Sequence, residues 1–267
     1  ISVQPSEAGP PPECEWGPQG VDLEACVNAA QPGTPWYALA HMNLGSRAAM
    51  QGDYATAVLH FDAAQPPGSQ IESDSMFHAI RGNAYHRVGR SEEALADARL
   101  ASEILAGRGR WPAEEANPDP DTAYALILPI LYEVEDPAFE TVLGAYLANP
   151  SRDLMVMANR AVTLLNLERY DEALQANAVA LELGPNEPAV LNSQCYILTL
   201  MHRAAEGLPF CERAIALVPD VAPVRHSLAA ALAGVGRCDE AEAELAQARR
   251  LDPAPAIYRE PIPCSPA

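Results

Sequence analysis

The chain has 267 residues, of which 49% are hydrophobic and 6% aromatic, with 17 basic against 36 acidic side chains. The formal charge of −19 disfavours nucleic acid as a partner, because such a surface repels phosphate backbones. No stretch reaches the ~20 apolar residues that a bilayer span needs, so we expect no direct membrane insertion.

Residues 1–35 are predicted to form an N-terminal extension with a short helix. The extension begins at Ile1 without a methionine or a signal-like apolar segment. We therefore expect a mature or truncated product from which a signal peptide has been removed.

Residues 36–254 are predicted to consist of repeated units, and the last three of these keep a period of 34. Pro185, Pro219 and Pro253 keep this spacing, and so do two sets of small residues, namely Ala180, Ala214 and Ala248, and Ala173, Gly207 and Ala241. Each period contains two apolar-periodic segments, such as 154–168 and 170–183, and ends in a breaker such as Gly184-Pro185. The predicted units are 38–69, 75–106, 119–150, 154–185, 188–219 and 222–253.

This pattern resembles the tetratricopeptide repeat (TPR) family, which carries small residues at repeat positions 8, 20 and 27. The first unit matches with Gly45, Ala57 and Ala64, and the second with Gly82, Ala94 and Ala101. The third is degraded, because it retains Ala138 and Ala145 but has Pro129 inside its first helix, where we expect a kink. The resemblance implies an all-α, right-handed solenoid of helix-turn-helix units with a concave groove.

Two connections are longer than a repeat requires, 66–74 and 106–122. The second is rich in proline and charge and contains Trp111, which either contacts a partner or covers the degraded third unit. Residues 255–267 form a proline-rich C-terminal tail.

The six cysteines fall as local pairs and show no metal-ligand spacing. Their even number suggests disulfides and an oxidising compartment, the alternative being six free thiols in a cytosolic protein. Fifteen connectivities exist in principle. The TPR register favours Cys195–Cys211, because these residues occupy the facing positions 8 and 24. With this pair it favours the neighbouring pairs Cys14–Cys26 and Cys238–Cys264. The first of these would tie down the N-terminal segment, and the second would pin the tail over the last repeat.

No motif for catalysis or cofactor binding appears: HExxH, phosphate-binding, GxSxG and EF-hand patterns are absent, and the histidines look scattered. We therefore expect no enzyme, no cofactor and no metal site. The TPR family lines its groove with residues of the first helix of each repeat. Carried over to this sequence, that register predicts a nearly uncharged peptide-binding groove that contains Met42, Asn43, Ser46, Asn83, Arg87, Tyr124, Asn159, Asn192, Ser193, Tyr196 and His226.

The uncharged groove suits an extended peptide, with asparagine amides bonding to its backbone and apolar surfaces receiving its side chains. Alternatively, these asparagines bond within the groove, or the 106–122 loop carries the binding site. We expect a scaffold or adaptor of a bacterial cell envelope, periplasmic or secreted, that binds a protein or peptide. The alternatives are a self-assembling homo-oligomer and a carbohydrate-binding or hydrolytic helical solenoid.

Overall fold

A computed structural model describes residues 10–15, 20–64, 74–107 and 120–264. The described residues contain helices and no β-strand. In chain order the α-helices are α1 (Leu23–Ala29), α2 (Pro35–Met50), α3 (Tyr54–Ala63), α4 (Ser75–Arg87), α5 (Ser91–Gly107), α6 (Pro120–Glu133), α7 (Phe139–Ala148), α8 (Leu154–Asn166), α9 (Tyr170–Leu183), α10 (Pro188–Leu200), α11 (Ala204–Leu217), α12 (Ala222–Gly234) and α13 (Cys238–Leu251). Most of the 66–74 and 106–122 connections, including Trp111, lies outside the described residues.

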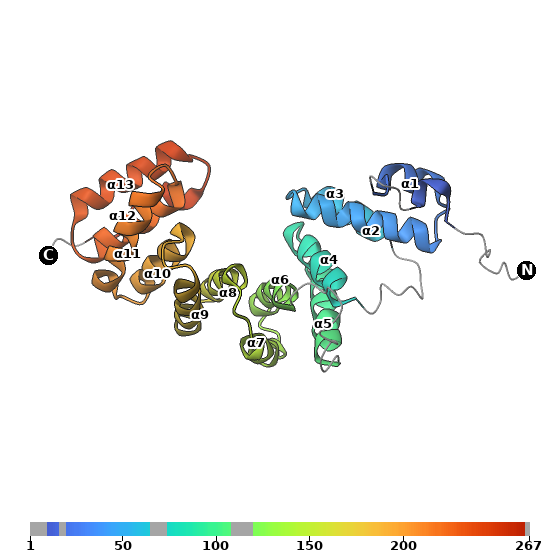
Figure 1. The fold of residues 1–267 in the computed structure, drawn as a ribbon, viewed down its shortest axis with the longest axis horizontal. Coiled ribbons are helices and arrows are strands. Elements are labelled where there is room, and N and C mark those ends of the chain that lie inside the picture. Colours follow the sequence, from blue (N-terminus) through green and yellow to red (C-terminus); the bar gives the residue numbers. More distant parts are fainter. Residues whose placement is uncertain (1–9, 16–19, 65–73, 108–119, 265–267) are drawn as a thin grey trace, which may run out of the picture. The chain divides into compact units, whose positions relative to one another are not determined.

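The chain divides into two compact parts, residues 1–149 and 150–267. In the first part α2 packs against α3, α4 against α5 and α6 against α7; in the second the pairs are α8–α9, α10–α11 and α12–α13 (Figure 1). The first helices of consecutive pairs also touch, so α4 lies between α2 and α6 in one part, and α10 lies between α8 and α12 in the other. The expected all-α fold of TPR-type helix pairs is confirmed.

Small residues let the paired helices approach closely. A Cβ atom on Gly45 would lie 2.7 Å from the Phe61 ring, and one on Gly207 would lie 2.8 Å from the Cys195 carbonyl oxygen. Ala57 and Ala94, at the facing position, are completely buried. A larger side chain at any of these sites would separate the helices and open voids in the core.

The turn inside each pair has a common hydrogen bond, which fixes the register of the repeats. The amide of the last turn residue donates to a carbonyl five residues earlier, as from Arg90 to Tyr85 (2.9 Å) and from Arg169 to Leu164 (2.9 Å). In the third pair the equivalent bond runs from Asp136 to Leu131 (2.9 Å). This places the third unit two residues later than its Ala138 and Ala145 suggest, and α6 continues through Pro129.

All six cysteines form disulfides in the expected pairs: Cys14–Cys26, Cys195–Cys211 and Cys238–Cys264. The first closes the segment around α1, which packs on α2, and the second joins α10 to α11. The third anchors the tail, where Tyr258 is buried against Ala222 and Ala248. Both ends of the repeat array are therefore covered by extensions of the same chain.

Candidate functional site

The first helices of the two parts carry the predicted groove residues as two separate sets. On α2, Met42 and Ser46 are half-buried and Asn43 is exposed; on α4, Asn83 is half-buried and Arg87 is exposed. In the second part, Asn159 on α8 is exposed, and α10 carries the half-buried Asn192, Ser193 and Tyr196. Within each part these residues lie on adjacent helices.

Two predicted groove residues present little surface. Tyr124 is buried, because the register of the third unit places it where His78 lies in the second, at the contact between paired helices. Its ring lies 5.8 Å from that of Tyr146, and burial raises the pKa of its hydroxyl, with Asp121 adding to the effect. His226 on α12 is also buried, with its ring 5.4 Å from Tyr258 in the tail.

Some polar groups of the predicted groove already have partners inside the chain. The Asn43 amide donates to the Leu39 carbonyl oxygen at 2.8 Å, and the Arg87 guanidinium lies 5.5 Å from the centre of the Tyr54 ring. In contrast, Asn192 has a buried side-chain oxygen without a hydrogen-bond partner. The exposed Asn159 is therefore the amide best placed to meet a ligand, and Asn192 is a half-buried amide whose oxygen has no partner among the described residues.

Exposed apolar side chains accompany these amides on the first helices. Leu39 on α2 is 44% exposed, and Met155 and Val162 on α8 are 63% and 42% exposed. The combination of the exposed Asn159 amide with exposed apolar side chains suits a peptide backbone with apolar substituents.

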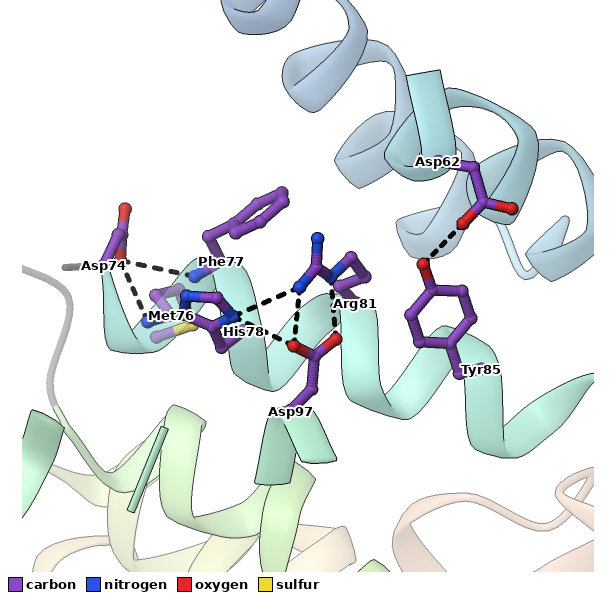
Figure 2. A network of polar contacts seen from close by, with 8 residues as sticks. All are labelled: Asp62, Asp74, Met76, Phe77, His78, Arg81, Tyr85 and Asp97. Atoms are coloured by element: carbon purple, nitrogen blue, oxygen red, sulfur yellow. Dashed lines mark hydrogen bonds and ion pairs between the residues drawn. The ribbon is translucent and has the colours of Figure 1, made fainter. Parts of the chain in front are cut away.

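Beneath the first part of this surface lies a buried polar network that holds α4 in place. His78 and Arg81 on α4 converge on Asp97 of α5, with nitrogen–oxygen distances of 2.9 Å from His78 and 2.7 Å from each of two Arg81 nitrogens (Figure 2). Burial opposes ionisation of Asp97, but the hydrogen bonds from Arg81 and His78 outweigh it and lower the pKa of the carboxyl.

The network continues to the preceding helix pair. The Tyr85 hydroxyl donates to Asp62 of α3 at 2.5 Å (Figure 2). Arg90 donates to the same carboxylate at 2.7 Å. Burial, followed by the hydrogen bond to Asp62, raises the pKa of Tyr85 far above its usual value. Tyr85 therefore remains a neutral donor that joins the first pair to the second.

The sequence register could have located this network, since His78 and Asp97 occupy repeat positions 4 and 23. The same two positions hold His41 and His60 in the first unit, with their Nδ1 atoms 2.9 Å apart, and Arg225 and Glu244 in the last, 2.6 Å apart. Compared along one helix at a time, the histidines looked scattered.

A cavity of about 590 Å³ opens between the N-terminal segment and α2. Its wall is mostly apolar, and Glu15 and Asn43 provide its polar side chains. Its described lining consists of Pro10, Cys14, Glu15, Gly20, Val21, Leu23, Cys26, Trp36, Leu39, Ala40 and Asn43. Repeat periodicity gives no signal for this cavity, because seven of its eleven described lining residues come from the non-repeat extension.

A second, shallower hollow of about 680 Å³ lies over two turns of the second part. It is lined by polar residues from 168–172 together with Leu200, Met201 and His202. Arg169 and Glu172 within it are paired at 2.5 Å. Its charged groups thus partly satisfy one another.

The described residues contain no group of three or more His, Cys, Asp or Glu side chains arranged to hold a metal ion. Within the same ranges, no helix combines the length and the apolar character that crossing a membrane requires.

Comparison with known protein structures shows which fold the chain has. No protein-family model matches the chain, and no curated protein matches it in sequence. A tetratricopeptide repeat protein from Parabacteroides merdae aligns over 90% of this chain and 88% of its own, with a TM-score of 0.60 and 15% identity. The chain has the tetratricopeptide repeat fold. PilW, a type IV pilus biogenesis factor, aligns over 83% of this TPR chain and 96% of its own, with a TM-score of 0.58 and 14% identity.

Proposed function

We propose that this TPR chain is a non-catalytic scaffold that binds an extended segment of a partner protein along its first helices. The observation that carries the proposal is the surface of α8, where the exposed amide of Asn159 lies on the same helix as the exposed Met155 and Val162, next to the half-buried amide of Asn192 on the adjacent α10. An extended peptide can pair its backbone with such amides and place alternate side chains on apolar surface.

Three disulfides support a location in an oxidising compartment such as the periplasm or the exterior of a bacterial cell. Disulfides are rare in proteins of the reducing cytosol. We therefore place the scaffold in the cell envelope.

End-to-end self-assembly is the less favoured alternative. The α1 segment packs on one end of the repeat array, and the disulfide-anchored tail packs on the other. Stacking repeats of neighbouring molecules would first have to displace these extensions. No specific contact favours the carbohydrate-binding or hydrolytic alternative.

Selection of peptides from a random phage-displayed library on the immobilised, oxidised protein tests the proposal. Peptides that bind should lose about fivefold in affinity on Asn159→Ala and on Asn192→Ala, since each hydrogen bond contributes about 1 kcal/mol. Gln175→Ala is the matched control, because Gln175 is an exposed amide on the second helix of the same unit. A library that yields no binders, or binders that ignore both asparagine variants, would exclude this groove.

A further inference from the structure

The N-terminal cavity, defined by the eleven lining residues given above, has a rigid wall. The Cys14–Cys26 disulfide joins both sides of the extension, and this pair packs with Ala30 and Ala40 in one buried cluster. An exposed ion pair of 2.9 Å between Glu24 of α1 and Arg47 of α2 adds a weaker link between the extension and the repeats. A cavity held by covalent and packed contacts is a preformed site rather than a gap between mobile segments.

The lining indicates which chemical group fits the cavity. Eight of its eleven described residues have apolar side chains, and its volume lies within the range of roughly 300–1,000 Å³ typical of ligand sites. Trp36 and the 44% exposed Leu39 offer contact surface to an incoming group. Such a wall favours a large apolar or aromatic side chain.

The charge around the cavity indicates what surrounds that side chain. Glu15 is the ionisable side chain of the described lining. Residues 1–64 contain seven carboxylates and a single arginine, Arg47, which is already paired with Glu24. A partner segment with lysine or arginine next to its apolar residue would complement this charge, whereas a second copy of the chain, at −19, would be repelled.

The cavity also adjoins the predicted groove. Leu39 and Asn43 contribute to its wall, and both lie on the α2 face that the repeat register assigns to the groove. We propose that the N-terminal cavity binds a large apolar side chain of a basic partner segment and so sets the position of that segment along α2 and α4, the first helices of the same part. This inference rests on the proposed function.

Trp36 provides a local readout. A variant with Trp16→Phe and Trp111→Phe leaves Trp36 as the single tryptophan of the full-length, oxidised chain. The probe is a nine-residue peptide with a central phenylalanine, serine neighbours and two lysines at each end. We expect it to change Trp36 fluorescence saturably, and we expect replacement of its phenylalanine by alanine, or of its lysines by glutamates, to weaken binding at least tenfold at low salt.

Three substitutions on the helix pair α2–α3 complete the test. Leu39→Asp should weaken binding of the phenylalanine peptide at least tenfold, and Leu39→Asn, which adds no charge, should weaken it in the same direction. Leu59→Asp is the matched control, because Leu59 is 72% exposed on α3 and is absent from the cavity lining. Circular dichroism melting checks that each variant is folded.

The inference fails if the phenylalanine and alanine peptides bind equally, if neither binds, or if Leu39→Asp has no more effect than Leu59→Asp. A Trp36 signal that depends on protein concentration without peptide would mean that a second copy occupies the cavity, and would also overturn it. Phage-selected peptides that respond to Asn159→Ala but not to Leu39→Asp would leave the groove proposal standing and reject the cavity alone. The opposite pattern would retain the cavity and reject the groove.

Discussion

Between α2 and α3 the helices meet through two imidazoles, His41 and His60, whose Nδ1 atoms are 2.9 Å apart. At the same repeat positions between α4 and α5, His78 meets the carboxylate of Asp97, which Arg81 also binds (Figure 2). The first contact is a hydrogen bond between two imidazoles whose pKa values are lowered, mainly by burial, and the second joins buried charges. One place in the fold thus accommodates two kinds of chemistry, which should respond differently to substitution and to pH.

The largest expected effect comes from removing the carboxylate. Asp97→Ala leaves the Arg81 guanidinium and the His78 ring buried without their partner, and we expect a loss of about 3 kcal/mol in the free energy of unfolding. Urea unfolding followed by circular dichroism measures the loss, and hydrogen exchange locates it in α4 and α5. Glu103→Ala, on the same helix but exposed and outside the network, should produce no measurable change. Equal effects of the two variants would mean that the buried network contributes nothing specific.

The last helix pair offers an intermediate case of the same contact. Arg225 and Glu244 pair at 2.6 Å, and their side chains are less deeply buried than those of His78 and Asp97. Glu244→Ala should therefore cost about 1 kcal/mol in urea unfolding, since water can solvate the released guanidinium. A cost as large as that of Asp97→Ala would contradict this order.

As the pH falls, the contact between His41 and His60 should weaken before the contact of His78 and Arg81 with Asp97. Burial, followed by the charge of His60, lowers the pKa of His41; burial, followed by the charge of Arg47, lowers that of His60, with Glu24 opposing. Groups with a lowered folded pKa stabilise the folded state above the unfolded pKa, about 6.5 for histidine, and lose that contribution as the pH falls through the folded value. The lowered pKa of Asp97 delays the corresponding loss to below about pH 3.8.

We therefore expect amides of α2 and α3, but not those of α4 and α5, to lose protection factors between pH 7 and pH 5. His60→Gln keeps a hydrogen-bonding group opposite His41 but does not titrate, so it should reduce this loss, while the buried His41 retains the remainder. His78→Gln is the control and should retain the whole loss. A loss of protection that is uniform over both helix pairs would show that the histidine contact is not its source.

The repeat period made much of the fold predictable from sequence. Small residues such as Gly45 and Gly207 are required wherever paired helices touch, and positions 8 and 24 correctly placed Cys195 opposite Cys211. The register of the third unit was less accessible. Its Ala138 and Ala145 imitate the family pattern, whereas the hydrogen bond from Asp136 to Leu131 sets the turn two residues later.

The candidate site was only partly predictable from the sequence, because the repeat register does not determine the contacts that each side chain makes. A repeat register assigns residues to a face, but it does not show which of them acquire partners, as His226 does with Tyr258 of the tail. The cavity lies beyond the reach of periodicity, because Cys14 and Val21 belong to a segment without a repeat. Its existence depends on how that segment folds back onto α2.

The smallest expected effect concerns the turns of the same helix pairs. The residue that precedes the amide donor of the turn hydrogen bond has a positive φ. It is Gly89 in the second pair (80°) and His202 in the fifth (59°). A side chain in this conformation costs roughly 1–2 kcal/mol, but glycine gives back part of the gain through its greater unfolded-state entropy. His202→Gly should therefore stabilise the protein by about 0.5 kcal/mol, and Gly89→Ala, whose added Cβ would meet no atom within 4 Å, should destabilise it by about 1 kcal/mol. Urea unfolding of both variants checks the signs, and a destabilised His202→Gly would reveal that the imidazole makes a stabilising contact strong enough to outweigh its backbone strain.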